Sequence, residues 1–187
     1  MGRRTPKIYS LKVETFLEKD LQTDMNNFKE ISAKELAFSP FDIKEEWMLV
    51  TAEKEGRVNT MTASWGGFGI MWNKQVAFIV IRPQRYTKEF VDDADCFSLT
   101  FFDKSYLKKL GYLGKVSGRD ENKIEKAELS IIHEEEIPYF EEAHTAIFIK
   151  KLYAQPMGGE YFLDKEIISK WFPQEDFHVL YIGEITK

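Results

Sequence analysis

The sequence predicts a β-barrel of the α+β class, in which short helices are inserted between strands. Apolar runs of strand length, separated by turn residues, recur along the chain, and only a few short stretches have helical spacing. No internal repeat or low-complexity tract interrupts this pattern, and 187 residues are the length of one domain. Many strands with short helices between them are typical of barrels.

The N-terminal part is expected to hold a lead-in and the first strands. Residues 1–27 are polar and mixed in charge, with one short helix expected at 13–20, and the domain proper is expected to be 28–187. A strand at 28–31 precedes a turn that Ser32 caps, with Glu35 three residues on. The next elements form a hairpin of two strands joined by a turn, at 47–52, 53–56 and 58–65.

The middle of the chain holds the most informative strands. Three glycines between 66 and 69 are expected to interrupt the strand pattern, and they do not form a dinucleotide-binding fingerprint. The run 75–81 is apolar on both faces, which predicts a strand covered on both sides, and 87–94 is expected to be a helix capped by Thr87. In the strand 96–102 one face is polar, with Cys96, Ser98 and Thr100, and this face points either at a ligand or at solvent.

The C-terminal half is expected to alternate helices, strands and glycine turns. Helical spacing appears at 105–113, 122–129 and 165–172. Strands are expected at 131–132, 139–140, 145–153 and 179–185, a glycine-bracketed loop at 115–120, and a turn at 156–159.

Composition excludes several classes of protein. A net charge of −5 argues against a nucleic-acid partner, and no run of about 18 apolar residues predicts a membrane span. The N-terminus lacks the apolar core of a signal peptide, and a single cysteine, Cys96, fits a reducing cytoplasm. The three histidines lie far apart without zinc-ligand spacing, so no metal site is expected.

Two stretches have the chemistry of a ligand site. The segment 59–65 sets a row of small hydroxyl side chains beside Met61 and Trp65, a wall suited to a flat polar heterocycle. The segment 82–87 brings Arg82 and Arg85 to a strand end just before a helix, an arrangement that suits a phosphate group. Together they indicate a pocket for a phosphorylated flat ligand.

Three motifs in order resemble the flavin reductase-like, FMN-binding split-barrel proteins, which include flavoredoxins and ferric reductases. They are Asn59-x-Met61-Thr62-Ala63-Ser64-Trp65, Arg82-Pro83-x-Arg85-Tyr86-Thr87 and Ser117-Gly118-Arg119-Asp120-x-x-Lys123. The resemblance covers about residues 28–187. It implies a split barrel, a homodimer, and FMN near the subunit interface, with FAD left open as the less favoured cofactor. Relatives often carry an acid where this chain has Asn122.

The resemblance also implies roles for individual residues. The isoalloxazine ring would be lined by Met61, Thr62, Ala63, Ser64 and Trp65, with Asn59 opening that motif. The phosphate and ribityl chain would be held by Arg82, Arg85, Tyr86 and Thr87. The adjacent strand would contribute Ser98, Leu99, Thr100 and Phe101. The loop closing over the cofactor would consist of Ser117, Gly118, Arg119, Asp120 and Lys123.

The expected activity is that of an NAD(P)H-dependent oxidoreductase that passes electrons from reduced flavin to a second, small-molecule or protein, acceptor. The cofactor does the redox chemistry, so no catalytic side chain is expected. Two alternatives stay open: an electron carrier of the flavoredoxin kind, reduced by a partner protein, and a ligand-binding barrel without cofactor. His178 is expected to be a packed or surface histidine and Cys96 to be inert, with the glutamate runs at 134–136 and 141–142 facing solvent.

Overall fold

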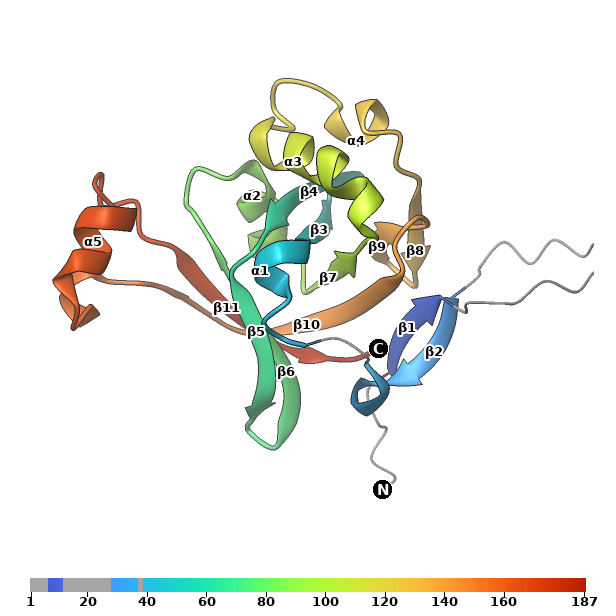
Figure 1. Ribbon diagram of the computed structural model, residues 1–187, viewed down its shortest axis with the longest axis horizontal. Helices are drawn as coiled ribbons and strands as arrows, with labels where there is room; N and C mark the ends of the chain where they lie inside the picture. Colours follow the sequence, from blue (N-terminus) through green and yellow to red (C-terminus); the bar gives the residue numbers. More distant parts are fainter. Residues whose placement is uncertain (1–6, 12–27, 37–38) are drawn as a thin grey trace, which may run out of the picture.

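A computed structural model describes residues 7–11, 28–36 and 39–187, so the helix expected at 13–20 lies outside the described residues. Its main sheet is antiparallel throughout, in the order β4-β3-β7-β10-β11-β6-β5 (Figure 1). Two further strands, β1 (Lys7–Leu11) and β2 (Phe28–Ser32), pair with each other, and β1 also pairs with β10. The strands along the main path are β3 (Met48–Lys54), β4 (Arg57–Ala63), β5 (Gly66–Met71), β6 (Lys74–Ile81), β7 (Cys96–Phe101), β10 (Thr145–Pro156) and β11 (Val179–Ile185).

The sheet curls into a barrel that is split along one line. The strands β4 and β5 stand at opposite ends of the hydrogen-bonded order, yet only Ser64 and Trp65 separate them in the chain. Two residues span only about 7 Å, so the two ends of the sheet meet at this point. No ladder joins β4 to β5 within the described part of the chain, and the barrel is therefore open along that seam. This confirms the predicted fold class.

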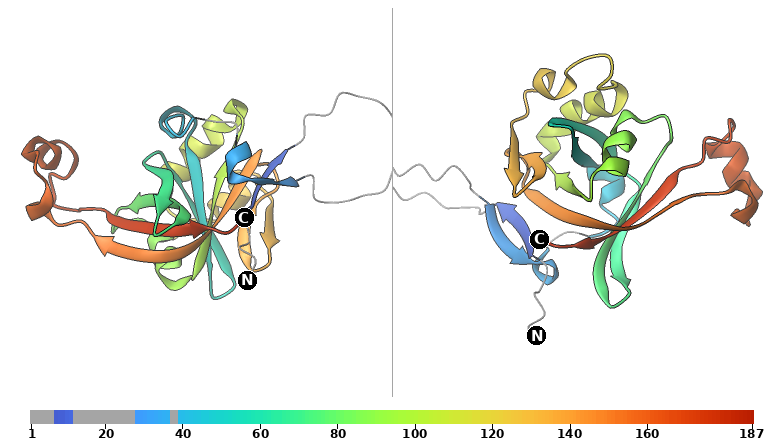
Figure 2. Two further views of the ribbon diagram at one scale, coloured as in Figure 1. Left: turned by 90° about the horizontal axis from the view of Figure 1, so that it is seen from below. Right: turned by 180° about the vertical axis from the view of Figure 1, so that it is seen from behind.

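Three helices cover one side of the barrel, and one stands apart (Figures 1 and 2). The covering helices are α2 (Tyr86–Asp93), α3 (Leu107–Lys115) and α4 (Lys123–Lys126), whereas α5 (Lys165–Trp171) lies on an arm formed by the extended ends of β10 and β11. The remaining short helices are η1 (Ala33–Glu35), α1 (Ile43–Glu46), η2 (Lys104–Tyr106) and η3 (Gly159–Tyr161). None of the described helices is long and apolar enough to cross a membrane.

The core has two main parts. One fills the barrel with side chains such as Val50, Ile79 and Leu99, all at most 1% exposed. The other joins α3 and α4 to the outside of the sheet through residues that include Leu49, Leu110, Leu113 and Ile124. Burial of these apolar side chains of α3 and α4 fixes the loop after α3 against the barrel.

The glycines at 66–69 do not interrupt the sheet, as the sequence pattern suggested, but form β5. Gly66 and Gly67 lie so close to Phe78 on β6 that a Cβ atom would be 2.5 and 2.7 Å from its atoms. Their lack of a side chain therefore permits the pairing of β5 with β6. The turn between them uses left-handed residues, Trp72 (φ 50°) and Asn73 (φ 56°), as two-residue hairpins require.

Neither prediction for the polar face of β7 is correct. Ser98 and Thr100 are fully buried, because the hairpin of β8 (Ile131–Glu134) and β9 (Ile137–Phe140) covers them. The hydroxyl of Ser98 donates a hydrogen bond of 2.6 Å to the carbonyl of Pro138. The polar face therefore serves packing between a sheet and a hairpin.

Other predicted boundaries shift by small amounts for local reasons. Helix α2 begins at Tyr86 with Arg85 as its N-cap, so Thr87 lies in the first turn and not at the cap. The helix expected at 122–129 ends at Lys126, and β10 continues through Pro156, which was expected to open a turn. The strand at 75–81 is not covered on both faces throughout, because Phe78 is 40% exposed.

Candidate functional site

Two adjoining cavities form a cleft where the first two motifs meet. The cationic lobe, of about 200 Å³, and the aromatic lobe, of about 270 Å³, share Met61, Arg82 and Arg85. The cationic lobe is also lined by Gln84, Tyr86, Thr87, Lys115, Val116, Ser117 and Lys123. The aromatic lobe is also lined by Thr62, Ala63, Ser64, Trp65, Val80, Trp171 and His178. Together the lobes reach the size of small-molecule sites, about 300–1,000 Å³.

Arg85 and Lys123 give the cationic lobe its charge. Arg85 Nη1 donates to the carbonyl of Gly114 at 2.6 Å, and Lys123 Nζ donates to the carbonyls of Leu113 and Val116, both at 2.9 Å. These carbonyls belong to the last turn of α3, where the helix dipole favours cations. Among the described residues, neither cation forms an ion pair with a carboxylate.

Burial makes the charge of Lys123 costly. The residue is only 4% exposed, and burial, with a smaller contribution from the nearby Arg85 guanidinium, lowers its pKa to about 8. Two close cations without a neutralising carboxylate form a site that an anion would stabilise.

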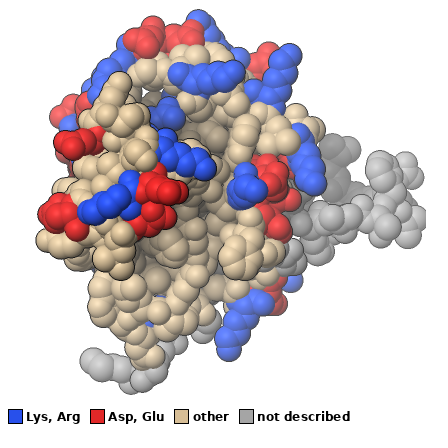
Figure 3. All heavy atoms as spheres, turned by 60° about the vertical axis from the view of Figure 1, so that its left-hand side comes forward, with Lys and Arg blue, Asp and Glu red and all other residues tan. Residues whose placement is uncertain are grey.

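The N-terminus of α2 opens onto the same lobe. The first N–H groups of a helix have no partner inside it, so those of Tyr86 and Thr87 are available to an acceptor. The Thr87 hydroxyl is fixed from behind, since it accepts a hydrogen bond of 2.9 Å from Asn59 Nδ2. A phosphate group fits this combination of helix N-terminus, guanidinium and ammonium. On the face seen in Figure 3, Lys and Arg side chains border a hollow.

The glycine loop after α3 closes against this lobe. A Cβ atom on Gly118 would collide with Asn59 Oδ1, so only glycine permits the close approach. Arg119 lies over the Tyr86 ring, 4.4 Å from its centroid, and forms an ion pair with Glu89. Arg119 therefore fastens the loop to α2 from outside and does not line the lobe, and Asp120 is exposed.

The aromatic lobe is built partly by the barrel and partly by the arm. Trp65, 39% exposed, packs edge-on against Trp171 with ring centroids 5.1 Å apart, and its ring lies 5.2 Å from His178. The Thr62 hydroxyl donates a 2.5 Å hydrogen bond to the carbonyl of Leu110, so this wall is tied to α3. Burial and the nearby Arg82 charge lower the pKa of His178 to about 4, which leaves its imidazole neutral near pH 7.

Arg82 connects the lobe to the arm. Its Nη1 pairs with the Asp176 carboxylate, its Nη2 donates to the Trp171 carbonyl at 2.6 Å, and its guanidinium lies 5.3 Å from the centre of the Phe172 ring. Hydrogen bonds from Gln84 and Arg82 hold the pKa of Asp176 below its usual range. In this geometry Arg82 anchors the arm, whereas no carboxylate of the described residues pairs with Arg85.

Most residues of the three predicted motifs meet in the cleft. The predicted site residues of these motifs that line neither lobe are Asn59, Gly118, Arg119 and Asp120. The four residues predicted on the adjacent strand β7 do not line the cleft either: Ser98, Leu99, Thr100 and Phe101 are all buried inside the sheet, away from both lobes. Sequence reasoning missed Trp171 as a lining residue and Asp176 as the partner of Arg82. It placed His178 among packed or surface histidines, and the residue is indeed 93% buried but faces the lobe. No local pattern in the sequence indicated an arm or showed where it would lie.

Within the described ranges, no group of three His, Cys, Asp or Glu side chains is arranged to hold a metal ion. Cys96 is half-buried, and burial raises the pKa of its thiol. A raised pKa lowers the thiolate fraction, which is the reactive form.

The family model described as the flavin reductase like domain matches residues 42–187. The chain belongs to this family. Solved structures share its fold: flavoredoxin from Methanosarcina acetivorans has a TM-score of 0.61 at 19% identity, over 76% of this chain and 66% of that one. An FMN-binding protein from Thermus thermophilus with bound p-hydroxybenzaldehyde has a TM-score of 0.59 at 22% identity, over 75% and 69%.

A similar sequence of unassigned role comes from Aeropyrum pernix. It is 33% identical over 103 residues, which are 54% of this chain and 39% of that protein. The chain thus spans less than two thirds of the Aeropyrum protein and of the Methanosarcina flavoredoxin. The solved structures show the fold, and the family model shows the family.

Proposed function

We propose that the cleft binds FMN, with the phosphate in the cationic lobe and the isoalloxazine ring in the aromatic lobe. The observation that carries the proposal is the pair Arg85 and Lys123, two cations without a carboxylate partner in the described chain, beside the N-terminus of α2. A flat, hydroxyl-rich wall continues directly from them at Thr62–Trp65. Proteins with similar folds include one whose description states that it binds FMN.

Different residues of the cleft would bind the phosphate and the flavin ring of FMN. Arg85, Lys123 and the N–H groups of Tyr86 and Thr87 would hold the phosphate, while Asn59 keeps Thr87 oriented. Met61 and Trp65 would pack on the flavin ring, and the Ser64 hydroxyl and neighbouring backbone would bond its polar edge. FMN is favoured over FAD because the cationic lobe is small, about 200 Å³, and the loop at Gly118 packs closely against Asn59 beside it.

We further propose that the protein is an NAD(P)H-dependent oxidoreductase that passes electrons on to a second acceptor. Bound FMN would supply the redox chemistry, and the protein would supply position, exclusion of water and electrostatics. Trp65 and Trp171 shield one side of the aromatic lobe, and the neutral His178 can donate or accept one hydrogen bond there. A flavin reductase, PheA2, has a similar fold, with a TM-score of 0.56 at 16% identity.

The first test is the colour of the protein. Purified material is expected to show a flavin spectrum or to gain one on titration with FMN, and to lose the yellow colour when NADH or NADPH is added without oxygen. A protein that neither copurifies with FMN nor releases heat on titration would contradict the binding proposal and favour a barrel without cofactor.

A second candidate function is an electron carrier that a partner protein reduces. The fold likeness to two flavoredoxins, from Methanosarcina acetivorans and Desulfovibrio vulgaris, favours it, as does the exposure of Trp65 and Trp171 at the mouth of the cleft. Tight FMN binding without bleaching by either nicotinamide, but with bleaching by a chemical reductant, would identify the carrier.

We also propose that the protein is a homodimer that uses the β5–β6 hairpin. This edge of the sheet exposes Ile70 (72%), Trp72 (57%) and Phe78 (40%), an apolar grouping unusual on a monomer. Ile70→Asp is expected to shift sedimentation velocity towards the monomer. The control is Phe41→Ser, because Phe41 is a single exposed aromatic (85%) on another part of the surface. A wild-type chain that sediments as a monomer at micromolar concentration would contradict the proposal.

A further inference from the structure

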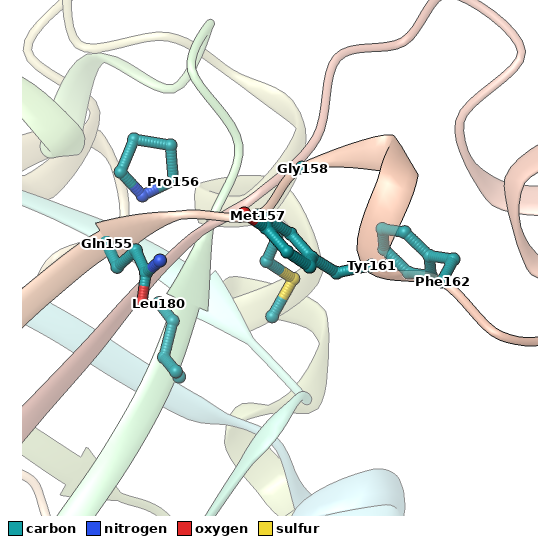
Figure 4. A pocket seen from close by; sticks show the side chains of 7 residues that line it. All are labelled: Gln155, Pro156, Met157, Gly158, Tyr161, Phe162 and Leu180. Carbon is teal, nitrogen blue, oxygen red and sulfur yellow. The ribbon is translucent and has the colours of Figure 1, made fainter.

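A third cavity lies on the arm, outside the cleft. This arm groove has a volume of about 350 Å³, and its walls include Gln155, Met157, Tyr161, Phe162 and Leu180. Figure 4 shows Gln155 and Leu180 on the two long strands at one side, and Tyr161 on η3 with Phe162 directly after it at the other. The FMN site proposed above uses none of these residues.

The arm groove continues the surface of the aromatic lobe. Val80 on β6 is the register partner of Leu180 on β11, and Leu180 is the partner of Gln155 on β10. Partners in antiparallel strands share one face of the sheet. Val80 lines the aromatic lobe, and the other two line the groove, so the two cavities lie side by side: Leu180 is one strand spacing, about 5 Å, from Val80, and Gln155 is two, about 10 Å.

Aromatic contacts connect the same two cavities. The ring of Phe162 in the groove lies 5.6 Å from that of Phe172, and Phe172 lies 5.3 Å from His178 in the lobe. The backbone N–H of Met157 donates to the carbonyl of His178 at 2.9 Å. A ligand whose two ends occupied the lobe and the groove would therefore rest on one packed surface.

The groove's walls suit a flat neutral heterocycle. None of the residues that line it is charged. The phenol of Tyr161, 73% exposed, offers a face for stacking, and the Met157 thioether offers a soft contact. The Gln155 amide offers N–H donors, since its Oε1 already accepts a hydrogen bond from the Tyr153 hydroxyl. The carboxylate of Glu160 lies close to Gly158 at the groove's edge, where it would repel a phosphate.

We propose that the arm groove binds the adenosine end of a nicotinamide dinucleotide whose other end enters the aromatic lobe, and that it selects NADH over NADPH. A 2′-phosphate would find no cation among the groove's walls and would face Glu160. A base stacked on Tyr161 and hydrogen-bonded by Gln155 would meet complementary groups instead. The inference rests on the proposed oxidoreductase function and specifies its substrate.

Adenosine and 2′-AMP are the probes for the groove itself. Adenosine carries no phosphate, so it does not compete for the cationic lobe, and its binding is measured by NMR line shifts with and without FMN. Saturable binding is expected, weaker for 2′-AMP, and Tyr161→Ala is expected to weaken it about fivefold or more. Leu163→Ala is the matched control, because Leu163 is 99% exposed on the same arm and does not line the groove.

Kinetics of FMN reduction provide the second readout. Tyr161→Ala is expected to raise the KM for NADH several-fold without changing FMN affinity, and Gln155→Arg is expected to raise the NADPH-to-NADH ratio of kcat/KM at least fivefold. Absence of adenosine binding, or equal binding by wild type and Tyr161→Ala, would overturn the groove proposal even if FMN is reduced. Adenosine binding in a protein that does not bind FMN would instead overturn the proposed function and leave the groove as an adenosine site. A Tyr161→Ala change that alters only sedimentation would assign the groove to a subunit contact and overturn the proposal.

Discussion

The two lobes of the cleft are built by different means. The cationic lobe lies within the barrel body, where Arg85, Lys123 and the start of α2 are held by hydrogen bonds to the end of α3. The aromatic lobe is completed by Trp171 and His178, which lie about a hundred residues later in the chain than Trp65. One end is rigid and charged, and the other is exposed, aromatic and dependent on an arm.

From this difference we infer that affinity for the phosphate and specificity for the molecule that meets the flavin ring depend on different lobes. The cationic lobe would bind any ligand that carries the same phosphate, because its contacts recognise the negative charge and little else of the ligand. The aromatic end would choose what meets the flavin ring, because its walls come from an arm that can vary without disturbing the barrel core. Substitutions in one lobe are therefore expected to leave the function of the other intact.

The largest expected effect concerns Arg85. Arg85→Ala is expected to weaken FMN binding by about 1.5–3 kcal/mol, because a charge-assisted hydrogen bond to the phosphate is lost. Fluorescence quenching of FMN on titration measures the change. Arg57→Ala is the control, since Arg57 is exposed at the start of β4 and lines neither lobe. Unchanged affinity in Arg85→Ala would mean that the phosphate lies elsewhere.

The pH dependence of FMN binding tests Lys123. In the free protein its pKa is about 8, and a bound phosphate would raise that pKa, so binding takes up a proton above pH 8. Affinity is therefore expected to fall as pH rises above 8, by at most about tenfold per pH unit. Lys123→Met should abolish this slope, whereas Lys126→Met, a change at an exposed lysine paired with Glu121, should keep it. A slope shared by all three proteins would exclude Lys123 from the phosphate site.

Much of the barrel and of the cationic lobe could be predicted from the sequence, because their signals are local. Alternation, turn residues and the Arg82–Thr87 segment each act within a few residues, and the expected strands lie where they were placed within short shifts. The exceptions are instructive. In the sequence, the glycines of β5 indicated a break in the strand. The reason these positions lack side chains is their close approach to Phe78 on the neighbouring strand, and the sequence pattern does not show that contact.

The remaining parts depend on contacts between distant segments. The burial of Ser98 depends on a hairpin forty residues later, and no pattern in β7 shows that this hairpin covers it. Arg82 was expected to hold the phosphate, but its commitment to Asp176 depends on where the arm returns to the sheet. Arg82 and Asp176 are 94 residues apart in the sequence, so residue spacing alone does not predict that they pair.

A smaller effect is expected from His178, on stability. Its pKa of about 4 in the folded protein lies below the ordinary value of 6.5, so between these pH values the unfolded chain binds more protons. The free energy of unfolding is therefore expected to fall as pH drops from 6.5 to 4, by at most about 1.4 kcal/mol per pH unit. Urea unfolding across this range should show a shallower decline for His178→Gln than for wild type. His133→Gln, on the exposed β8 strand, should match wild type.

The smallest effect decides the role of Arg82. Asp176→Asn removes the charge that pairs with Arg82 while leaving a side chain that Gln84 can still bond. If Arg82 anchors the arm, the substitution should loosen Trp171 and raise the KM for the nicotinamide two- to fivefold, with FMN affinity nearly unchanged. If Arg82 instead holds the phosphate, freeing its guanidinium should tighten FMN binding. The two roles thus predict changes in different measurements. Tighter FMN binding would show that Arg82 binds the phosphate in the cationic lobe and does not serve mainly to anchor the arm.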